Sequence, residues 1–287
     1  MLDLQDIKVK SKKLVAKKIV SKKTWLNVMG SVWLITALSG CSALSSDHQL
    51  CDLRVLALQI NQESADATIG AAEAIQALKN SQEKLSAISP QVIKHISNEQ
   101  DAKKLQADIE TIQSNIKVIV DNKKTINKIY DFRLMAAEAI PGIQAEYNLM
   151  TDIMARENYA SIQIVIVKNQ VFIAERILRS IYNLTDSDHN GISTSDDLIS
   201  DIETFNAYLK AQLDGSAELG VQRINDAVLR DSLMSIKQDT DQVLMAGINQ
   251  LQMEMHEMAK VQNAVKTNQE KAMDVFYTLE KLDATSK

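Results

Sequence analysis

Residues 244–258 read LMAGINQLQMEMHEM, and the apolar positions within them set the architecture of the chain. These positions follow one another in steps of four, three, four and three residues: Leu244, Ile248, Leu251, Met255 and Met258. Such stepping places them on one face of a helix that packs in a bundle or coiled coil. The methionines fit a helical core better than a metal site, because methionine commonly fills gaps between packed helices.

The composition of the 287-residue chain is also that of a helical protein. It contains two prolines and eight glycines, and aromatic residues make up 4%. The net charge is −5 although residues 1–24 hold eight lysines against two aspartates, so the remainder is markedly acidic. An acidic surface repels the phosphate backbone, which argues against nucleic acid as a partner.

Apolar periodicity of three and four residues continues through most of the chain. It predicts helices over 52–88, 91–120, 125–156, 159–184 and 196–213, followed by a long final helix that reaches toward Leu282. Ser89-Pro90 should end the first helix, and Pro141-Gly142 should kink the third. The expected fold is all-α: an elongated antiparallel helical bundle in two related modules, residues 52–157 and 158–287, with a long C-terminal helix.

The first 51 residues have the features of an export signal and a tether. Eight lysines between Lys8 and Lys23 precede an uncharged apolar run, and this run closes on Leu38-Ser39-Gly40-Cys41, the pattern of a bacterial lipoprotein signal. We expect residues 1–40 to be a signal peptide or membrane anchor and residues 41–51 a tether. Lipidation of Cys41 would give a periplasmic lipoprotein of the inner or outer membrane; an uncleaved segment would instead be a single-pass inner-membrane anchor. Cys51 is then left as a lone thiol.

Two segments of the chain resemble each other. Leu53–Ile60 and Ala174–Ile181 each place an arginine before two aliphatic residues, with a further aliphatic residue at the same offset. This likeness suggests that a helical module was duplicated.

The same segments carry a resemblance to a known family. Asp52-Leu53-Arg54-Val55-Leu56, Ala139-Ile140-Pro141 with Glu146-Tyr147, and Ala174-Glu175-Arg176-Ile177-Leu178 resemble the periplasmic sensor region of type IV pilus chemotaxis transducers. This PilJ family is itself similar to the nitrate-sensing region of NarX-type kinases. The likeness spans roughly residues 50–245.

The resemblance implies a membrane-tethered periplasmic sensor-like binding protein of the type IV pilus chemosensory system, which controls twitching motility. Its partners would be a chemotaxis transducer or pilus component, a small anion and a second copy of the chain in a homodimer. The signalling parts of a full transducer do not follow Leu282, so signalling would need another chain. The alternative is a structural helical envelope lipoprotein with no small-molecule ligand.

Arg54 and Arg176 are the sharpest candidates for ligand binding. A guanidinium presents a planar fork that suits nitrate, carboxylate or phosphate, and two of them facing each other could hold a small oxyanion. Alternatively, each arginine pairs with a neighbouring acid such as Asp52 or Glu175, or is solvated.

Residues 186–197 match the calcium loop of an EF-hand in part. Oxygen donors stand at the first, third, fifth and twelfth positions, glycine at the sixth, and a carbonyl would come from the seventh: Asp186, Asp188, Asn190, Asp197, Gly191 and Ile192. Asp197 is shorter than the usual glutamate and Ser193 replaces an aliphatic residue, so a calcium site here would be weak. The alternative is a polar turn with Asn-Gly at its tip.

The sequence gives no support for catalysis. Its four histidines are scattered, and neither a glycine-rich phosphate loop nor a nucleophile elbow occurs. We therefore expect a protein that is not an enzyme and that has no cofactor apart from the weak calcium site.

Overall fold

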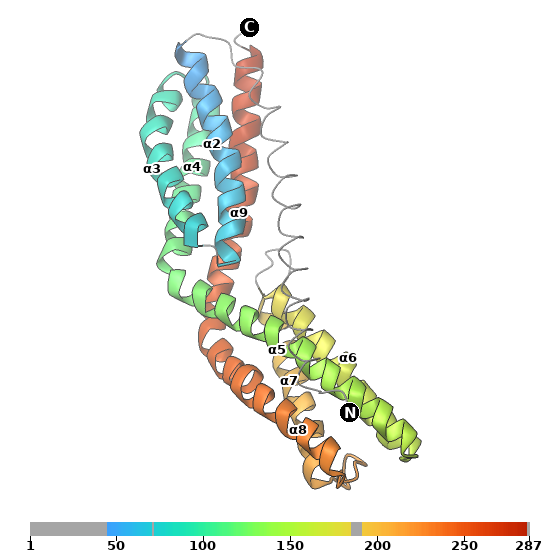
Figure 1. Ribbon diagram of the computed structural model, residues 1–287. Coiled ribbons are helices and arrows are strands. Elements are labelled where there is room, and N and C mark those ends of the chain that lie inside the picture. Colours follow the sequence, from blue (N-terminus) through green and yellow to red (C-terminus); the bar gives the residue numbers. More distant parts are fainter. Residues whose placement is uncertain (1–44, 71, 185–190, 286–287) are drawn as a thin grey trace, which may run out of the picture.

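A computed structural model describes residues 45–70, 72–184 and 191–285 of the chain. These residues form the following helices, shown in Figure 1: α2 (Ser45–Thr68), α3 (Ala72–Lys94), α4 (Glu99–Asp121), α5 (Lys123–Arg156), α6 (Ser161–Asn183), α7 (Gly191–Asp214), α8 (Ala227–Asp239), the π-helical turn η2 (Thr240–Met245) and α9 (Ala246–Thr285). No strand forms among them, and Ser216 and Val221 make an isolated antiparallel bridge. The predicted all-α fold is confirmed.

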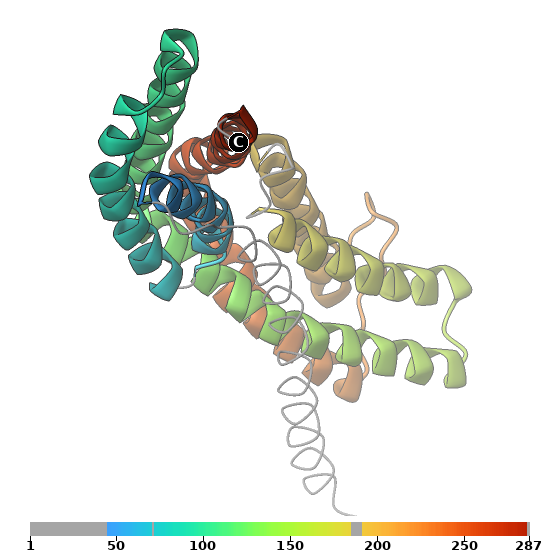
Figure 2. The same cartoon turned by 90° about the horizontal axis from the view of Figure 1, so that it is seen from above.

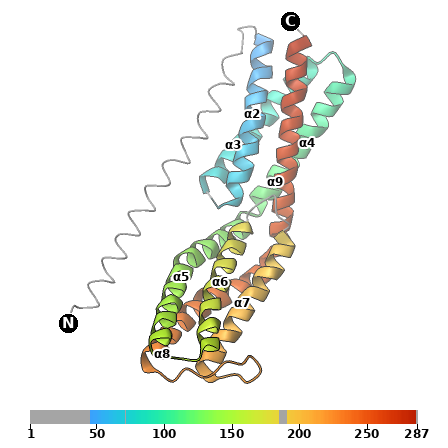
Figure 3. The same cartoon turned by 90° about the vertical axis from the view of Figure 1, so that its right-hand side faces the viewer.

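One end of the molecule is an antiparallel bundle of α2, α3, α4 and the C-terminal part of α9 (Figures 1 and 3). Each helix buries an apolar stripe, and the predicted α4 positions Leu105, Ile109, Ile112, Ile116 and Ile119 are all in the core. Helix α4 starts where the side chain of Asn98 accepts hydrogen bonds from the backbone N–H groups of Gln100 and Asp101, at 2.9 and 3.3 Å. We call this the terminal bundle.

The other end is a second antiparallel bundle of α5, α6, α7 and α8, which we call the distal bundle. Tyr147 and Phe205 lie in its core with their rings edge to face, 5.8 Å between centroids. The two bundles are set at an angle to each other, as the views in Figures 1 and 2 show.

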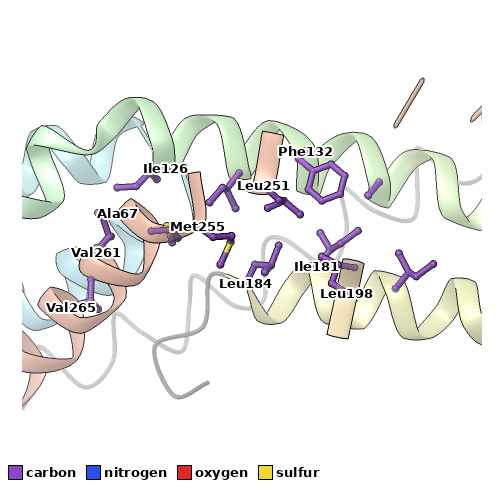
Figure 4. Close-up of a cluster of buried hydrophobic side chains, with 14 of the residues drawn as sticks. Ala67, Ile126, Phe132, Ile181, Leu184, Leu198, Leu251, Met255, Val261 and Val265 are labelled. Carbon is purple, nitrogen blue, oxygen red and sulfur yellow. The ribbon is translucent and has the colours of Figure 1, made fainter. Parts of the chain in front are cut away.

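The apolar cores of the two bundles are continuous through the bend. Figure 4 shows the side chains that meet there, which come from five helices and the residue after α6: Ala67 of α2, Ile126 and Phe132 of α5, Ile181 of α6 and the following Leu184, Leu198 of α7, and Leu251, Met255, Val261 and Val265 of α9. The bend is therefore a packed part of the core and not an open linker.

Helix packing crosses the module boundary that the sequence analysis placed at residue 157. A boundary at residue 157 separates α5 from α6, which pack along each other, and assigns all of α9 to the second module. In the structure α5 belongs with α6–α8, while the C-terminal part of α9 returns to complete the bundle of α2–α4. Periodicity identifies a buried face but does not tell which helix covers it.

Several helix ends also differ from the expected ones. Residues 52–88 are two helices, because the chain turns at Gly70, whose φ of 81° suits glycine and whose Cα faces the ring of Tyr130. Pro90 does not end α3, which runs on to Lys94, whereas Pro141 lies inside α5 as expected. Helix α7 starts at Gly191 rather than Asp196, and residues 215–226 are a loop that shortens the final helix.

The start of α2 and the end of α9 lie at the same end of the molecule, which we call the terminal pole, and the distal bundle forms the opposite end (Figures 1 and 3). None of the helices described for the chain combines the length and apolarity of a transmembrane segment.

Candidate functional site

Arg54 lies at the terminal pole, on the face of α2 that packs against α9. Its guanidinium is 3.8 Å from Glu280 and 3.6 Å from Asp283, and it covers the ring of Phe276 at 4.9 Å from the centroid. The arginine side chain is 23% exposed. Two carboxylates and an aromatic face thus neutralise and cover this cation, and it fastens the end of α9 to α2.

Arg176 lies in the distal bundle, where α6 meets α7. Its Nε donates to Asp201 Oδ2 at 2.6 Å, and its NH2 group donates to the other carboxylate oxygen. This bidentate hydrogen bond raises the pKa of Arg176, and Asp197 adds a weaker attraction. The arginine therefore holds two helices together through its ion pair with Asp201.

The two arginines do not form one site. Arg54 belongs to the pair α2 and α9, and Arg176 to the pair α6 and α7, in different bundles. The partners differ from those expected, because Asp52 pairs with His48 at 3.3 Å and Glu175 accepts a hydrogen bond from Gln144 at 3.1 Å.

The burial patterns of the two similar segments also differ when the arginines are aligned. Leu53 and Leu56 are buried beside Arg54. At the corresponding positions beside Arg176, Glu175 is exposed and Leu178 is partly buried. The buried positions coincide only after a shift of one residue, so the two arginines do not occupy equivalent places on their helices.

An open groove of about 480 Å³ runs between α2 and α3 near the terminal pole. Its lining includes the apolar Val55, Leu56 and Ile88 and the charged Asp52 and Lys84. An apolar lining with both signs of charge suits a small amphipathic molecule. Sequence reasoning missed this groove, because its residues are spread over two helices that had been taken as one.

A buried polar cluster crosses the core of the distal bundle. The Tyr147 hydroxyl donates to Gln212 Oε1 at 3.0 Å, while the Gln170 amide N–H donates to the Phe205 carbonyl at 2.9 Å and lies 3.3 Å from the same hydroxyl. Burial raises the pKa of Tyr147, so its hydroxyl stays protonated. Such a cluster favours one alignment of α5, α6 and α7 over others.

The candidate calcium loop is only partly described. Asp186, Asp188 and Asn190 lie outside the described residues, while Gly191, Ile192 and Asp197 form the first two turns of α7. An EF-hand loop over these residues would require those turns to unwind. Within the described residues there is no group of three or more histidine, cysteine or acidic side chains that could hold a metal ion.

The structure describes one of the two cysteines. Cys41, the predicted lipidation site, lies outside the described residues. Cys51 is partly buried on α2 and is not a free thiol, contrary to the expectation of a lone cysteine.

Comparison with known proteins finds chemotaxis proteins. The chain is 25% identical over 245 residues to a protein described as methyl-accepting chemotaxis AlkN of Alcanivorax borkumensis, a match that covers 85% of the chain and 36% of that protein. It is 25% identical over 197 residues to Protein PilJ of Pseudomonas aeruginosa, covering 64% of the chain and 29% of PilJ. The resemblance to PilJ-like chemotaxis proteins is confirmed.

The chain spans about a third of the length of these PilJ-like relatives. The AlkN match is long enough that it must include helices of both bundles. No family model matches the chain.

Proposed function

We propose that this protein is an extracytoplasmic sensor-like binding protein of the type IV pilus chemosensory class, which governs twitching motility. The observation that carries the proposal is the match to AlkN over 85% of the chain, which extends the resemblance beyond a few motifs. The protein would act by binding a chemotaxis transducer or pilus component, and by pairing with a second copy of itself, rather than by catalysis.

The arrangement of the terminal pole supports a role in signalling. Arg54 of α2 is bound to Glu280 and Asp283 of α9, so a displacement of either helix is passed to the other at this pole. A change at the distal bundle could reach the pole through α9, which is part of the core at the bend and of the terminal bundle. Transmission through packed helices of this kind needs no flexible linker.

Tethering to the membrane is supported by the sequence of residues 8–41. The lysines favour retention on the cytoplasmic side, and the apolar run and Cys41 fit a lipoprotein signal. Intact mass of the protein from the membrane fraction tests this, with Cys41→Ala alongside. A mature chain that begins at Cys41 with added acyl mass, lost in the variant, is expected; an uncleaved chain of unmodified mass would indicate a transmembrane anchor instead.

A structural role without a small ligand is the second candidate, and the pairing of the arginines favours it. A shared oxyanion site would need both guanidinium groups in one cavity, but each is already neutralised in its own bundle. Thermal unfolding with and without millimolar nitrate, on the wild type, Arg54→Gln and Arg176→Gln, separates the two. A stabilisation by nitrate that either variant abolishes would support an anion-binding sensor, whereas no shift in any of them would support a role without a small ligand.

Deletion of the gene in the source organism tests the sensor proposal itself. We expect the twitching zone to shrink and to recover with the wild-type gene. A normal twitching zone accompanied by a leaky envelope would contradict the sensor role and support the structural one.

A further inference from the structure

The buried positions of the last helical segment do not follow one regular repeat. From α8 into α9 the centre of the buried face follows Leu229, Leu233, Ile236, Thr240, Leu244, Ile248, Leu251, Met255 and Met258, with Ser232 and Gly247 buried beside it. The steps between them alternate between four and three, except that three consecutive steps of four occur from Ile236 to Ile248. The segment therefore contains one residue more than a regular seven-residue repeat requires.

The π-helical turn Thr240–Met245 lies where this extra residue occurs. A π turn has wider hydrogen-bonded rings than an α turn, so it takes up one additional residue. It thereby keeps the buried face of α8 and the buried face of α9 pointing toward the core. The buried faces of α8 and α9 therefore require a turn of this kind between them.

Two contacts bracket the turn and tie this segment to α5. Ser232 Oγ donates to Glu146 Oε2 at 2.9 Å before the turn, and after it Gly247 lies so close to Phe132 that an added Cβ would be 2.0 Å from the ring. The stretch from Ser232 to Gly247 is one residue longer than the facing stretch of α5 from Phe132 to Glu146.

Helix α5 is weakened in the same interval. Pro141 has no N–H to donate to the carbonyl of Ala137, and Gly142 follows it with open space around its Cα. The π turn packs against α5. Two neighbouring helices thus depart from regular α-helical bonding between the same pair of contacts.

We propose that this level of the distal bundle is a built-in conformational joint. The extra residue in the π turn and the missing hydrogen bond at Pro141 allow α8 and the tip of α5 to shift against α9 while both bundles keep their cores. Motion of α8 and the tip of α5 relative to the rest of the molecule is concentrated here. The joint follows from the packing alone. The proposal is therefore independent of which molecule the protein binds.

Single-residue deletions in the full chain test the extra residue. Removal of the exposed Gln242 leaves steps that alternate between four and three throughout, so the segment can become one continuous α-helix. Removal of the exposed Gln252, in the regular part of α9, is the matched control and turns Met255 and Met258 out of register. We expect the Gln242 deletion to keep its melting temperature and the Gln252 deletion to lower it strongly.

Hydrogen–deuterium exchange then tests the mobility of the joint. In the wild type, amides of residues 241–246 should exchange at least about tenfold faster than those of α8 and of residues 250–258, and this difference should vanish when Gln242 is deleted. Pro141→Ala should slow exchange around residue 141. Equal protection of the π turn and its flanks in the wild type would overturn the proposal, as would a Gln242 deletion that destabilises the protein as much as the Gln252 deletion.

Discussion

At the scale of single residues, Asp239 carries a charge that its surroundings disfavour. Burial raises the pKa of this carboxyl, and the nearby Glu146 raises it further. An acid whose pKa is higher in the folded state contributes most to stability below its unfolded pKa, and this contribution is lost as the pH rises through the folded pKa.

We therefore expect Asp239→Asn to raise the melting temperature at pH 7 by about 2 °C, the shift that ~1 kcal/mol produces in a protein of this size, and to have little effect near pH 3. Asp241→Asn is the matched control, since Asp241 is exposed and bonded to Lys237. A lower melting temperature for Asp239→Asn at pH 7 would show that the carboxylate makes a favourable contact.

The pKa of Glu254 is shifted in the opposite direction from that of Asp239. Lys128 lowers the pKa of this carboxyl by hydrogen bonding, and so does Thr125, whose hydroxyl donates to it at 2.5 Å. A lowered pKa stabilises the fold above the unfolded pKa of the group, and this stabilisation disappears as the pH falls through the folded pKa.

Glu254→Gln should accordingly lower the free energy of unfolding at pH 7 by about 1–3 kcal/mol, because it weakens two bonds between α5 and α9. The loss should shrink when urea unfolding is repeated at pH 3. An equal loss at both values would mean that packing rather than charge accounts for the effect.

At the scale of helices, the close contact of α9 with α5 depends on Gly247. A Cβ at this position would collide with the Phe132 ring, so Gly247→Ala should destabilise the protein by about 1–3 kcal/mol although alanine is the better helix former. Gly142→Ala is the control, because nothing lies within 4 Å of its added Cβ, and it should be neutral or stabilising.

Urea unfolding of both variants, and of Gly247→Ala combined with Phe132→Leu, measures this contact. The double variant should recover part of the loss, since leucine lacks the ring atoms that clash. If Gly142→Ala were the more destabilising of the two glycine variants, the close packing at Gly247 would not limit stability.

The sequence predicted buried faces better than helix ends. The positions predicted from the three- and four-residue period in the 105–119 and 244–258 stretches are buried, because such a period reports directly on one helix face, whereas Met253, which lies off that face, is 72% exposed. Pro90 was taken for a helix end, yet α3 runs four residues further, and the turn at Gly70 was missed. A glycine turn is hard to recognise when both of its flanks keep the same apolar period.

The candidate site was less accessible to sequence reasoning than the fold. Arg54 and Arg176 were correctly seen as cations on two helices, but their true partners, Asp283 and Asp201, lie 229 and 25 residues further along the chain. Pairing at such separations is decided by the topology of the bundles, which local spacing does not encode.

At the scale of the whole molecule, the continuous core at the bend should make the two bundles unfold together. We expect one calorimetric transition whose van't Hoff and calorimetric enthalpies agree. Leu251→Ala, at the centre of this core, should lower the free energy of unfolding by about 2–5 kcal/mol. Two separated transitions in the wild type would show that each bundle is stable without the other.

The π turn also affects where the gene can tolerate the insertion or loss of a single codon. A one-codon insertion in a packed helix normally rotates everything that follows out of its core, so it is rarely tolerated. Between α8 and α9 the consequences of such an insertion are confined to a single turn. Naturally occurring length variants of this protein should therefore differ by one codon near Thr240–Met245 more often than anywhere else in its last helical segment.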